Sequence, residues 1–165
     1  VAKLFASLTV EESLRGALQS PLGRSLQMHG SFPLRQTRDR AFEVMEQLGL
    51  DSKATTVAGN LSHGDQKLLD IALALVLKPK VLLLDEPLSN LDAKLREKLR
   101  RDIRKIQQEF GLTMVYVTHD QKEAFQMSDK VVVMNKGRIE QIGTPEEIMK
   151  KPASAFVEDF VRSGE

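Results

Sequence analysis

The sequence predicts an α/β protein whose sheet is mostly parallel and whose first part is helical. After residue 80, short apolar runs alternate with segments of helical periodicity, which is the pattern of strands joined by crossover helices. The run Val81–Leu84 is continuously apolar, as is typical of a strand buried on both faces of a parallel sheet. We therefore expect a helical subdomain over residues 1–75 and an α/β core over residues 76–165.

The composition fits one globular domain with a core of its own. Apolar residues make up 41% of the 165 residues and charged residues 28%. The net charge of +1 gives no reason to expect a nucleic-acid partner. The chain contains no cysteine, and its three histidines lack the spacing of a metal motif. No apolar stretch approaches the ~18 residues of a membrane span, so we expect a cytoplasmic protein.

Helix starts and ends are marked in the first part of the chain. Thr9 and Glu12 have the spacing of a capping box. A second helix is predicted by apolar residues at helical spacing and by a glycine placed to end it, namely Ala41, Val44, Met45, Leu48 and Gly49. A third helix is predicted in the same way by Leu68, Ile71, Ala72 and Leu75, with Pro79 just past its end.

The second part of the chain continues with alternating elements. A long amphipathic helix is marked by Leu95, Leu99, Ile103, Ile106 and Phe110, and Gly111 closes it. The elements expected after it are a strand at Met114–Val117, a helix at Gln121–Met127, a strand at Val131–Met134, a tight turn at Asn135–Gly137, a strand near Ile139–Ile142, a helix started by Thr144, Pro145 and Glu147, and a last helix at Ala153–Val161.

Two carboxylates follow the first predicted strand. Asp85 and Glu86 come directly after Val81–Leu84, at the carboxyl edge of the sheet, where α/β proteins bind their ligands. In phosphoryl transfer, one such carboxylate can hold Mg²⁺ while its neighbour orients or deprotonates the attacking water. The alternative is a strand that simply leaves the core through two solvated acidic residues.

Two other segments carry candidate phosphate contacts. Ser62 and Gly64 stand at the start of a predicted helix, where free backbone N–H groups and the helix dipole attract an anion. The alternative is an ordinary N-cap, with Ser62 capping and Asp65 at the third helical position. His119 follows the strand Met114–Val117 at the same sheet edge and could hydrogen-bond a terminal phosphate. The alternative for His119 is a purely structural histidine.

Four segments occur in a fixed order, namely Leu61–Gln66, Val81–Pro87, Ser89–Asp92 and Thr118–Asp120. In order and in interval they resemble the signature motif, Walker B strand, D-loop and switch histidine of ABC-type ATPases. The resemblance covers essentially the whole chain. It implies an incomplete P-loop NTPase fold, in which residues 76–165 form the C-terminal part of a RecA-like core.

The resemblance also implies roles for single residues. Asp85 would assist Mg²⁺, Glu86 would be the catalytic base, and His119 would stabilise the γ-phosphate of ATP. Residues that would contact nucleotide or couple two active sites are Ser62, Gly64, Gln66 and Asp92. The family works as head-to-tail dimers, so the signature residues would serve ATP held by a partner subunit. The dimer would be formed with the same or another ABC ATPase subunit.

For the whole protein, the resemblance implies an ATP-binding subunit that couples ATP hydrolysis to solute import. Such a subunit binds transmembrane permease subunits at the inner face of the cell membrane. The signature segment Leu61–Gln66 is most similar to that of branched-chain amino-acid and urea importers. The segments Ser89–Asp92, Met114–Gln121 and Asn135–Pro145 are more similar to sugar, polyamine or ferric-ion importers. The transported substrate is therefore left open between these two groups.

The 165 residues depart from the family in one respect. They contain no phosphate-binding loop of the form G-x-x-x-x-G-K-[ST], and no Gly-Lys dipeptide at all. We therefore expect no appreciable ATP binding or turnover by this chain alone, and unpaired strand edges that favour aggregation or association with another chain. Two alternative functions follow, a non-catalytic partner that supplies only its signature half-site, and a regulatory or interaction protein that keeps the fold.

Overall fold

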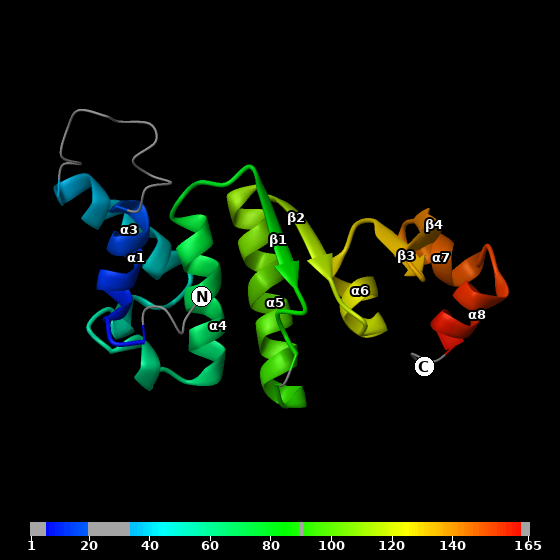
Figure 1. Ribbon diagram of the computed structural model, residues 1–165, viewed down its shortest axis with the longest axis horizontal. Coiled ribbons are helices and arrows are strands. Elements are labelled where there is room, and N and C mark those ends of the chain that lie inside the picture. The colour runs from blue at the N-terminus through cyan, green and yellow to red at the C-terminus, as the bar shows by residue number, and fades with distance from the viewer. Residues whose placement is uncertain (1–5, 20–33, 90, 163–165) are drawn as a thin grey trace. The chain divides into compact units, whose positions relative to one another are not determined.

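The computed structural model describes residues 6–19, 34–89 and 91–162 (Figure 1). The chain divides into two compact units. The first unit comprises Val1–Leu82 and Leu91–Thr113, and the second comprises Leu83–Asn90 and Met114–Glu165. The division into residues 1–75 and 76–165 that the sequence suggests remains a prediction.

The first unit is built from helices. Its elements are α1 (Val10–Gln19), α3 (Leu34–Gln47), the short 3₁₀ helices η2 (Asp51–Lys53) and η3 (Ala58–Asn60), α4 (His63–Leu75) and α5 (Ala93–Phe110). Helices α1, α3 and α4 pack against one another. Their fully buried side chains include Val10, Leu14, Val44, Met45 and Leu69. The apolar spacing that predicted α3 and α4 therefore marks the face that each helix buries.

The caps predicted for these helices are confirmed. The Thr9 backbone N–H donates to the Glu12 carboxylate at 2.8 Å, and the Glu12 N–H donates back to Thr9 Oγ1 at 3.2 Å. Gly49 and Gly111 follow α3 and α5 with φ of 65° and 58°, the left-handed conformation that glycine adopts at low cost. These local signals fix where the helices begin and end.

Strands β1 (Val81–Asp85) and β2 (Thr113–Val117) lie side by side in one sheet and run in the same direction (Figure 1). This parallel pair confirms the α/β class. The predicted burial on both faces is wrong for the part of the chain that the structure describes. The outward side chains Val81, Leu83, Val115 and Val117 are between 45% and 64% exposed.

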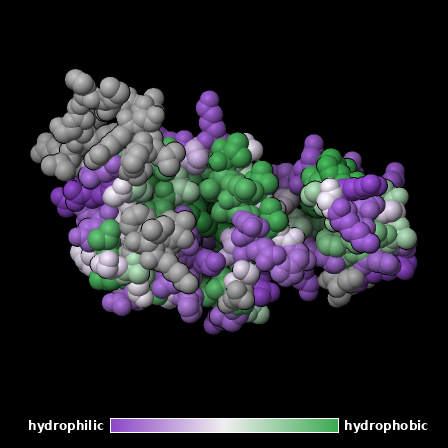
Figure 2. All heavy atoms as spheres, in the orientation of Figure 1, coloured by the Kyte–Doolittle hydropathy of each residue, from purple (hydrophilic) through white to green (hydrophobic). Residues whose placement is uncertain are grey.

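The reason is that burial of a strand depends on what covers each face, which an apolar run cannot specify. Side chains alternate between the faces of a strand, and the opposite face of β1 holds Leu82, which is only 6% exposed. Hydrophobic surface is visible over β1 and β2 (Figure 2). Among the described residues, one face of this sheet is thus more buried than the other.

The rest of the second unit is a hairpin covered by helices. Strands β3 (Val131–Asn135) and β4 (Arg138–Gly143) pair antiparallel across a turn at Lys136 and Gly137, whose φ angles are both positive. Helices α6 (Gln121–Met127), α7 (Pro145–Lys150) and α8 (Ala155–Arg162) complete the unit. The core of this unit is formed by Val131, Val133, Ile148 and Val157. The strands, the turn and the Thr144–Glu147 capping box all agree with the sequence prediction.

Leu82 and Leu83 are neighbours on opposite faces of β1 and therefore form a matched pair. Leu82→Ala should lower the free energy of unfolding by about 2–4 kcal/mol, because truncating a buried leucine leaves a cavity. Leu83→Ala should lower it by less than about 1 kcal/mol, because most of that side chain is already in water. Urea unfolding followed by circular dichroism measures both values. Equal losses at the two positions would show that the more exposed face is covered in solution.

Candidate functional site

The two predicted catalytic residues meet where β1 and β2 end. The Glu86 backbone N–H donates to the Val117 carbonyl at 2.9 Å, which holds the two strand ends together. Glu86 directly follows β1 and His119 lies two residues beyond β2, and Glu86 Oε1 is 2.9 Å from His119 Nδ1. Because a carboxylate can only accept, Nδ1 is the donor in this bond. The side chains are 48% and 78% exposed, so both are open to a ligand.

Glu86 has an unusual backbone conformation. Its φ is 41°, in the left-handed region that residues other than glycine seldom adopt. The strain is offset by Ser89, whose N–H and Oγ–H both donate to the Glu86 carbonyl at 3.1 and 2.8 Å. This turn ends the strand at Asp85 and turns the Glu86 carboxylate toward His119. Strain of this kind is common at functional positions.

The charge around His119 favours its protonated form. The hydrogen bond that His119 donates to Glu86, and then the negative charge of Glu86, raise the pKa of His119 above its ordinary value, and the carboxylates of Glu123 and Asp120 act in the same direction. An imidazolium whose Nδ1 is held by Glu86 still has Nε2–H to donate. Such a group suits an anionic ligand such as a phosphate.

Asp85, the predicted metal residue, is exposed at the end of β1. Among the described residues, no group of three or more histidines and acidic residues is arranged to hold a metal ion by itself. Mg²⁺ does not need such a group, because it usually takes one or two carboxylates and completes its shell with water and substrate phosphates. Asp85 fits that kind of site, and its role remains a prediction.

The signature segment forms the first turn of α4. Ser62 is the N-cap, and its Oγ accepts from the Asp65 N–H at 3.2 Å and donates to Asp65 Oδ2 at 2.6 Å. The Gln66 side-chain amide donates to the Leu61 carbonyl at 3.1 Å. The N-cap described as the alternative in the sequence is therefore present. Anion binding by the same residues stays a prediction.

Gly64 packs closely against a neighbouring helix. A Cβ at this position would lie 2.7 Å from Leu95 Cδ1, so any larger residue would require the end of the Leu95 side chain to shift. Leu95 belongs to α5, and its backbone N–H donates to Asp92 Oδ1 at 2.9 Å in the N-cap of that helix. Leu95 thus connects the signature segment to the predicted D-loop residue Asp92.

An ion pair beside the signature segment has no counterpart in the sequence predictions. Lys53 Nζ lies 2.6 Å from Asp65 Oδ1. Burial acts to raise the pKa of Asp65, but hydrogen bonds from Lys53 and Ser62 and the charges of Lys53 and Lys98 outweigh it, so that pKa lies below its ordinary value. No local pattern could have revealed this pair, because Lys53 lies on η2 and reaches α4 only through the fold.

The predicted site residues therefore form two sets. Glu86 and His119 are in contact, with Asp85 next to Glu86, and all three belong to the second unit. The signature residues and Asp92 belong to the first unit and are linked through Leu95. Each set is held by contacts within its own unit.

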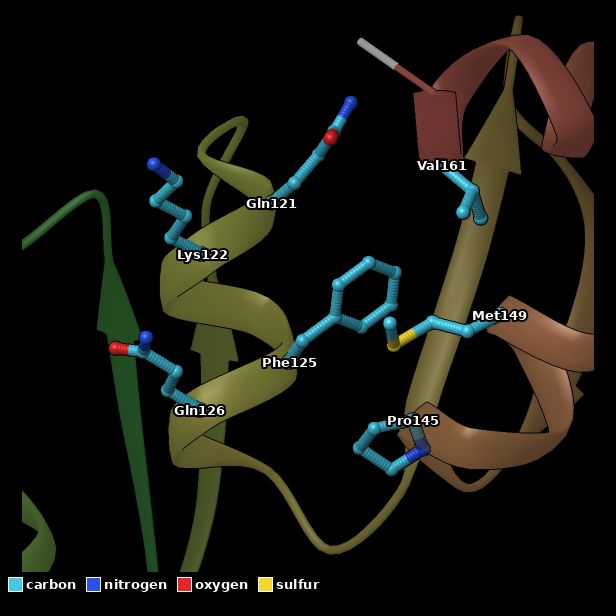
Figure 3. A pocket seen from close by; sticks show the side chains of 7 residues that line it. All are labelled: Gln121, Lys122, Phe125, Gln126, Pro145, Met149 and Val161. Carbon is cyan, nitrogen blue, oxygen red and sulfur yellow. The ribbon is translucent and has the colours of Figure 1, made fainter. Parts of the chain in front are cut away.

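A pocket of about 320 Å³ in the second unit is separate from these residues (Figure 3). Its apolar lining comes from Phe125 on α6, Pro145 and Met149 on α7 and Val161 on α8. None of the predicted site residues lines it. The candidate site therefore does not lie in this pocket.

Glu86→Gln keeps the shape of the Glu86 side chain and removes its charge. We expect the pKa of His119 to fall toward the ordinary histidine value, because both the hydrogen-bonded carboxylate and its charge are removed. Because the pair raises the pKa of His119 in the folded state, its stabilising contribution is present at low pH and is lost as the pH rises through that pKa. NMR titration of the His119 ring measures the shift. An unchanged titration would show that Glu86 does not set the charge of His119.

Lys53→Met should lower the free energy of unfolding by about 1 kcal/mol at pH 7, because it leaves the partly buried Asp65 carboxylate without its cation. The same change in an Asp65→Asn background should have almost no effect. Because the pKa of Asp65 is lowered, the loss should disappear as the pH falls through that pKa. Urea unfolding of the four proteins measures the coupling. Equal effects in both backgrounds would rule out a stabilising pair.

No helix within the described ranges is both long enough and apolar enough to cross a lipid bilayer. The chain is 48% identical over 145 residues to the Fe(3+) ions import ATP-binding protein FbpC of Photorhabdus laumondii, a match that covers 88% of this chain and 41% of that protein. It is 44% identical over 158 residues to FbpC 2 of Rhizobium meliloti, covering 96% of this chain and 38% of that protein. The chain thus spans about two fifths of the length of these relatives.

Two solved structures of an ATP-binding cassette of an ABC transporter, one of them in its ADP conformation, share the fold with TM-scores of 0.74. Their sequence identity to this chain is 23%, and they cover 94% and 95% of it, while it covers 64% and 65% of theirs. The likeness confirms the P-loop NTPase fold of ABC ATPases. The family model for ABC transporters matches residues 2–89, more than half of the chain. The chain therefore belongs to the ABC transporter family.

Proposed function

We propose that this chain is part of the ATP-binding subunit of an ABC importer and that its two sets of site residues act on ATP. The observation that carries the proposal is the contact between Glu86 and His119 at the ends of adjacent parallel strands. If a phosphate-binding loop occupied the same sheet edge, an attacking water would lie next to Glu86 and a terminal phosphate next to His119.

Each residue at this edge would have its own role. The Glu86 carboxylate would accept a proton from the attacking water, and the His119 Nε2–H would donate to the terminal phosphate. Asp85 would hold Mg²⁺, which supplies charge neutralisation on the phosphates when it is bound. The exposure of all three side chains leaves room for the substrate.

The first unit would act on a second ATP molecule. The N–H groups at the start of α4 and the Ser62 hydroxyl would contact ATP held by a partner subunit in a head-to-tail dimer. Gln66 in the same turn and Asp92, linked to it through Leu95, would complete that surface. The partner would be the same or another ABC ATPase subunit.

The solute and the membrane partners are inferred from the relatives. FbpC proteins of several bacteria carry Fe(3+) import in their names, which favours ferric ion within the two substrate groups that the motifs leave open. The subunit would bind transmembrane permease subunits at the inner face of the membrane. The conformational change on ATP hydrolysis would drive uptake.

Complementation between two inactive variants tests this proposal. The chain is fused to the phosphate-binding segment of a complete ABC ATPase, and Mg²⁺-dependent ATP hydrolysis is measured. Glu86→Gln and Ser62→Arg should each abolish activity in the fusion protein. A mixture of the two should recover at most about a quarter of the original rate, because half of the dimers would contain one intact composite site.

The control is a mixture of Glu86→Gln with a Glu86→Gln, Ser62→Arg double variant, which contains no intact site and should stay inactive. Activity of the single Glu86→Gln variant would contradict the role of Glu86. A lack of recovery in the mixture of two stable, dimeric variants would contradict the composite site.

A further inference from the structure

A buried carboxylate lies directly behind the candidate site, and none of the roles proposed above uses it. Glu123, in the first turn of α6, is only 4% exposed. Its Oε2 atom accepts two hydrogen bonds, from the Thr118 hydroxyl at 2.7 Å and from the Tyr116 hydroxyl at 3.0 Å. A buried charge is costly unless it is well hydrogen-bonded, so this carboxylate is held in a defined network.

The network includes the residues directly before and after His119 in the sequence. Thr118 precedes His119, and its Oγ1 accepts from the Asp120 N–H at 3.0 Å while it donates to Glu123. Asp120 follows His119, and its Oδ1 accepts from the Glu123 N–H at 3.1 Å as the N-cap of α6. Both neighbours of His119 are therefore tied to Glu123, one to its side chain and one to its backbone.

His119 itself has little other support. Its ring is mostly exposed and reaches Glu86 Oε1 over 2.9 Å. An exposed side chain makes such a contact at a lower entropic cost when its backbone is fixed, because the backbone then does not have to be ordered as the bond forms. The fixed backbone is what the Glu123 network provides.

We propose that Glu123 is a positioning residue that holds the Thr118–Asp120 loop so that His119 contacts Glu86. Its importance for ATP rests on the function proposed above, whereas its effect on His119 is a property of this chain alone. Glu123 touches no predicted ligand and acts through Thr118.

A second explanation is that Glu123 affects His119 only through its charge, since its carboxylate also favours the imidazolium. The two explanations differ for Thr118 and Tyr116. Both donate to the same oxygen of Glu123, but only Thr118 is next to His119. Removing one hydroxyl or the other leaves the charge of Glu123 in place.

The test compares Thr118→Val with Tyr116→Phe in the 165-residue chain by ¹⁵N NMR of the His119 ring. Thr118→Val should lose the Nδ1 signal of a hydrogen-bonded imidazole and lower the titration midpoint toward the ordinary histidine value. Tyr116→Phe should leave both unchanged. Thr118→Ser, which keeps the hydroxyl, should restore the original spectrum.

Two replacements of Glu123 separate position from charge. Glu123→Gln keeps an acceptor for Thr118 and should preserve the Nδ1 signal, although it removes the charge. Glu123→Met keeps the length without an acceptor and should lose the signal. Thermal unfolding and the backbone amide spectrum show whether each variant is folded. If Thr118→Val is not folded, Thr118→Ala takes its place.

The proposal is overturned if folded Thr118→Val or Thr118→Ala retains the Nδ1 signal, or if Glu123→Gln and Glu123→Met behave alike. These measurements need no nucleotide. Their failure would leave the proposed ATPase function standing, and a failure of the ATPase complementation would leave the NMR result standing.

Discussion

The candidate site depends on the parallel pairing of β1 and β2. Parallel strands carry their carboxyl ends to one edge, so residues far apart in the sequence meet there. The hydrogen bond from the Glu86 N–H to the Val117 carbonyl fixes that edge at its last position. Beyond this edge, the left-handed backbone of Glu86 turns the segment that follows β1, and the Thr118–Asp120 loop turns the segment that follows β2. A shift of one residue between the strands would send the carboxylate and the imidazole to opposite faces of the sheet.

The signature segment shows how capping and anion binding can share the same atoms. Ser62 Oγ both accepts from and donates to Asp65, so a phosphate would have to replace Asp65 as its partner. The Asp65 carboxylate and a phosphate are both charged acceptors, so the hydrogen bond from Ser62 contributes about 1.5–3 kcal/mol with either partner. A phosphate can therefore compete for the Ser62 hydroxyl, while Ser62 Oγ continues to accept the N-cap bond from the Asp65 N–H. Lys53 keeps its hold on the other oxygen of Asp65 and offsets a negative charge that would otherwise repel the phosphate.

The elements that the sequence predicts well are those set by local rules. The capping box at Thr9, the glycine that ends α5 at Gly111 and the turn before β4 each depend on a few neighbouring residues. The contacts that it misses join distant segments. The sequence near Asp65 does not predict its ion pair with Lys53. Gly64 alone suggests a phosphate contact, whereas the structure shows that it also packs against Leu95. The apolar run of β1 predicts a strand correctly and its burial wrongly, because burial depends on what lies over each face.

In a composite active site, the signature residues of one subunit act on ATP held by another subunit. Each of the two sets of site residues must then have its shape before the subunits meet. The contacts of this chain satisfy that demand. Glu86 and His119 are held by Ser89 and by the Thr118–Asp120 loop within the second unit. The first turn of α4 is held by its own cap, by Lys53 and by Leu95 within the first unit. Formation of such a dimer then needs little reordering of either half, so less of the interaction energy is lost to ordering.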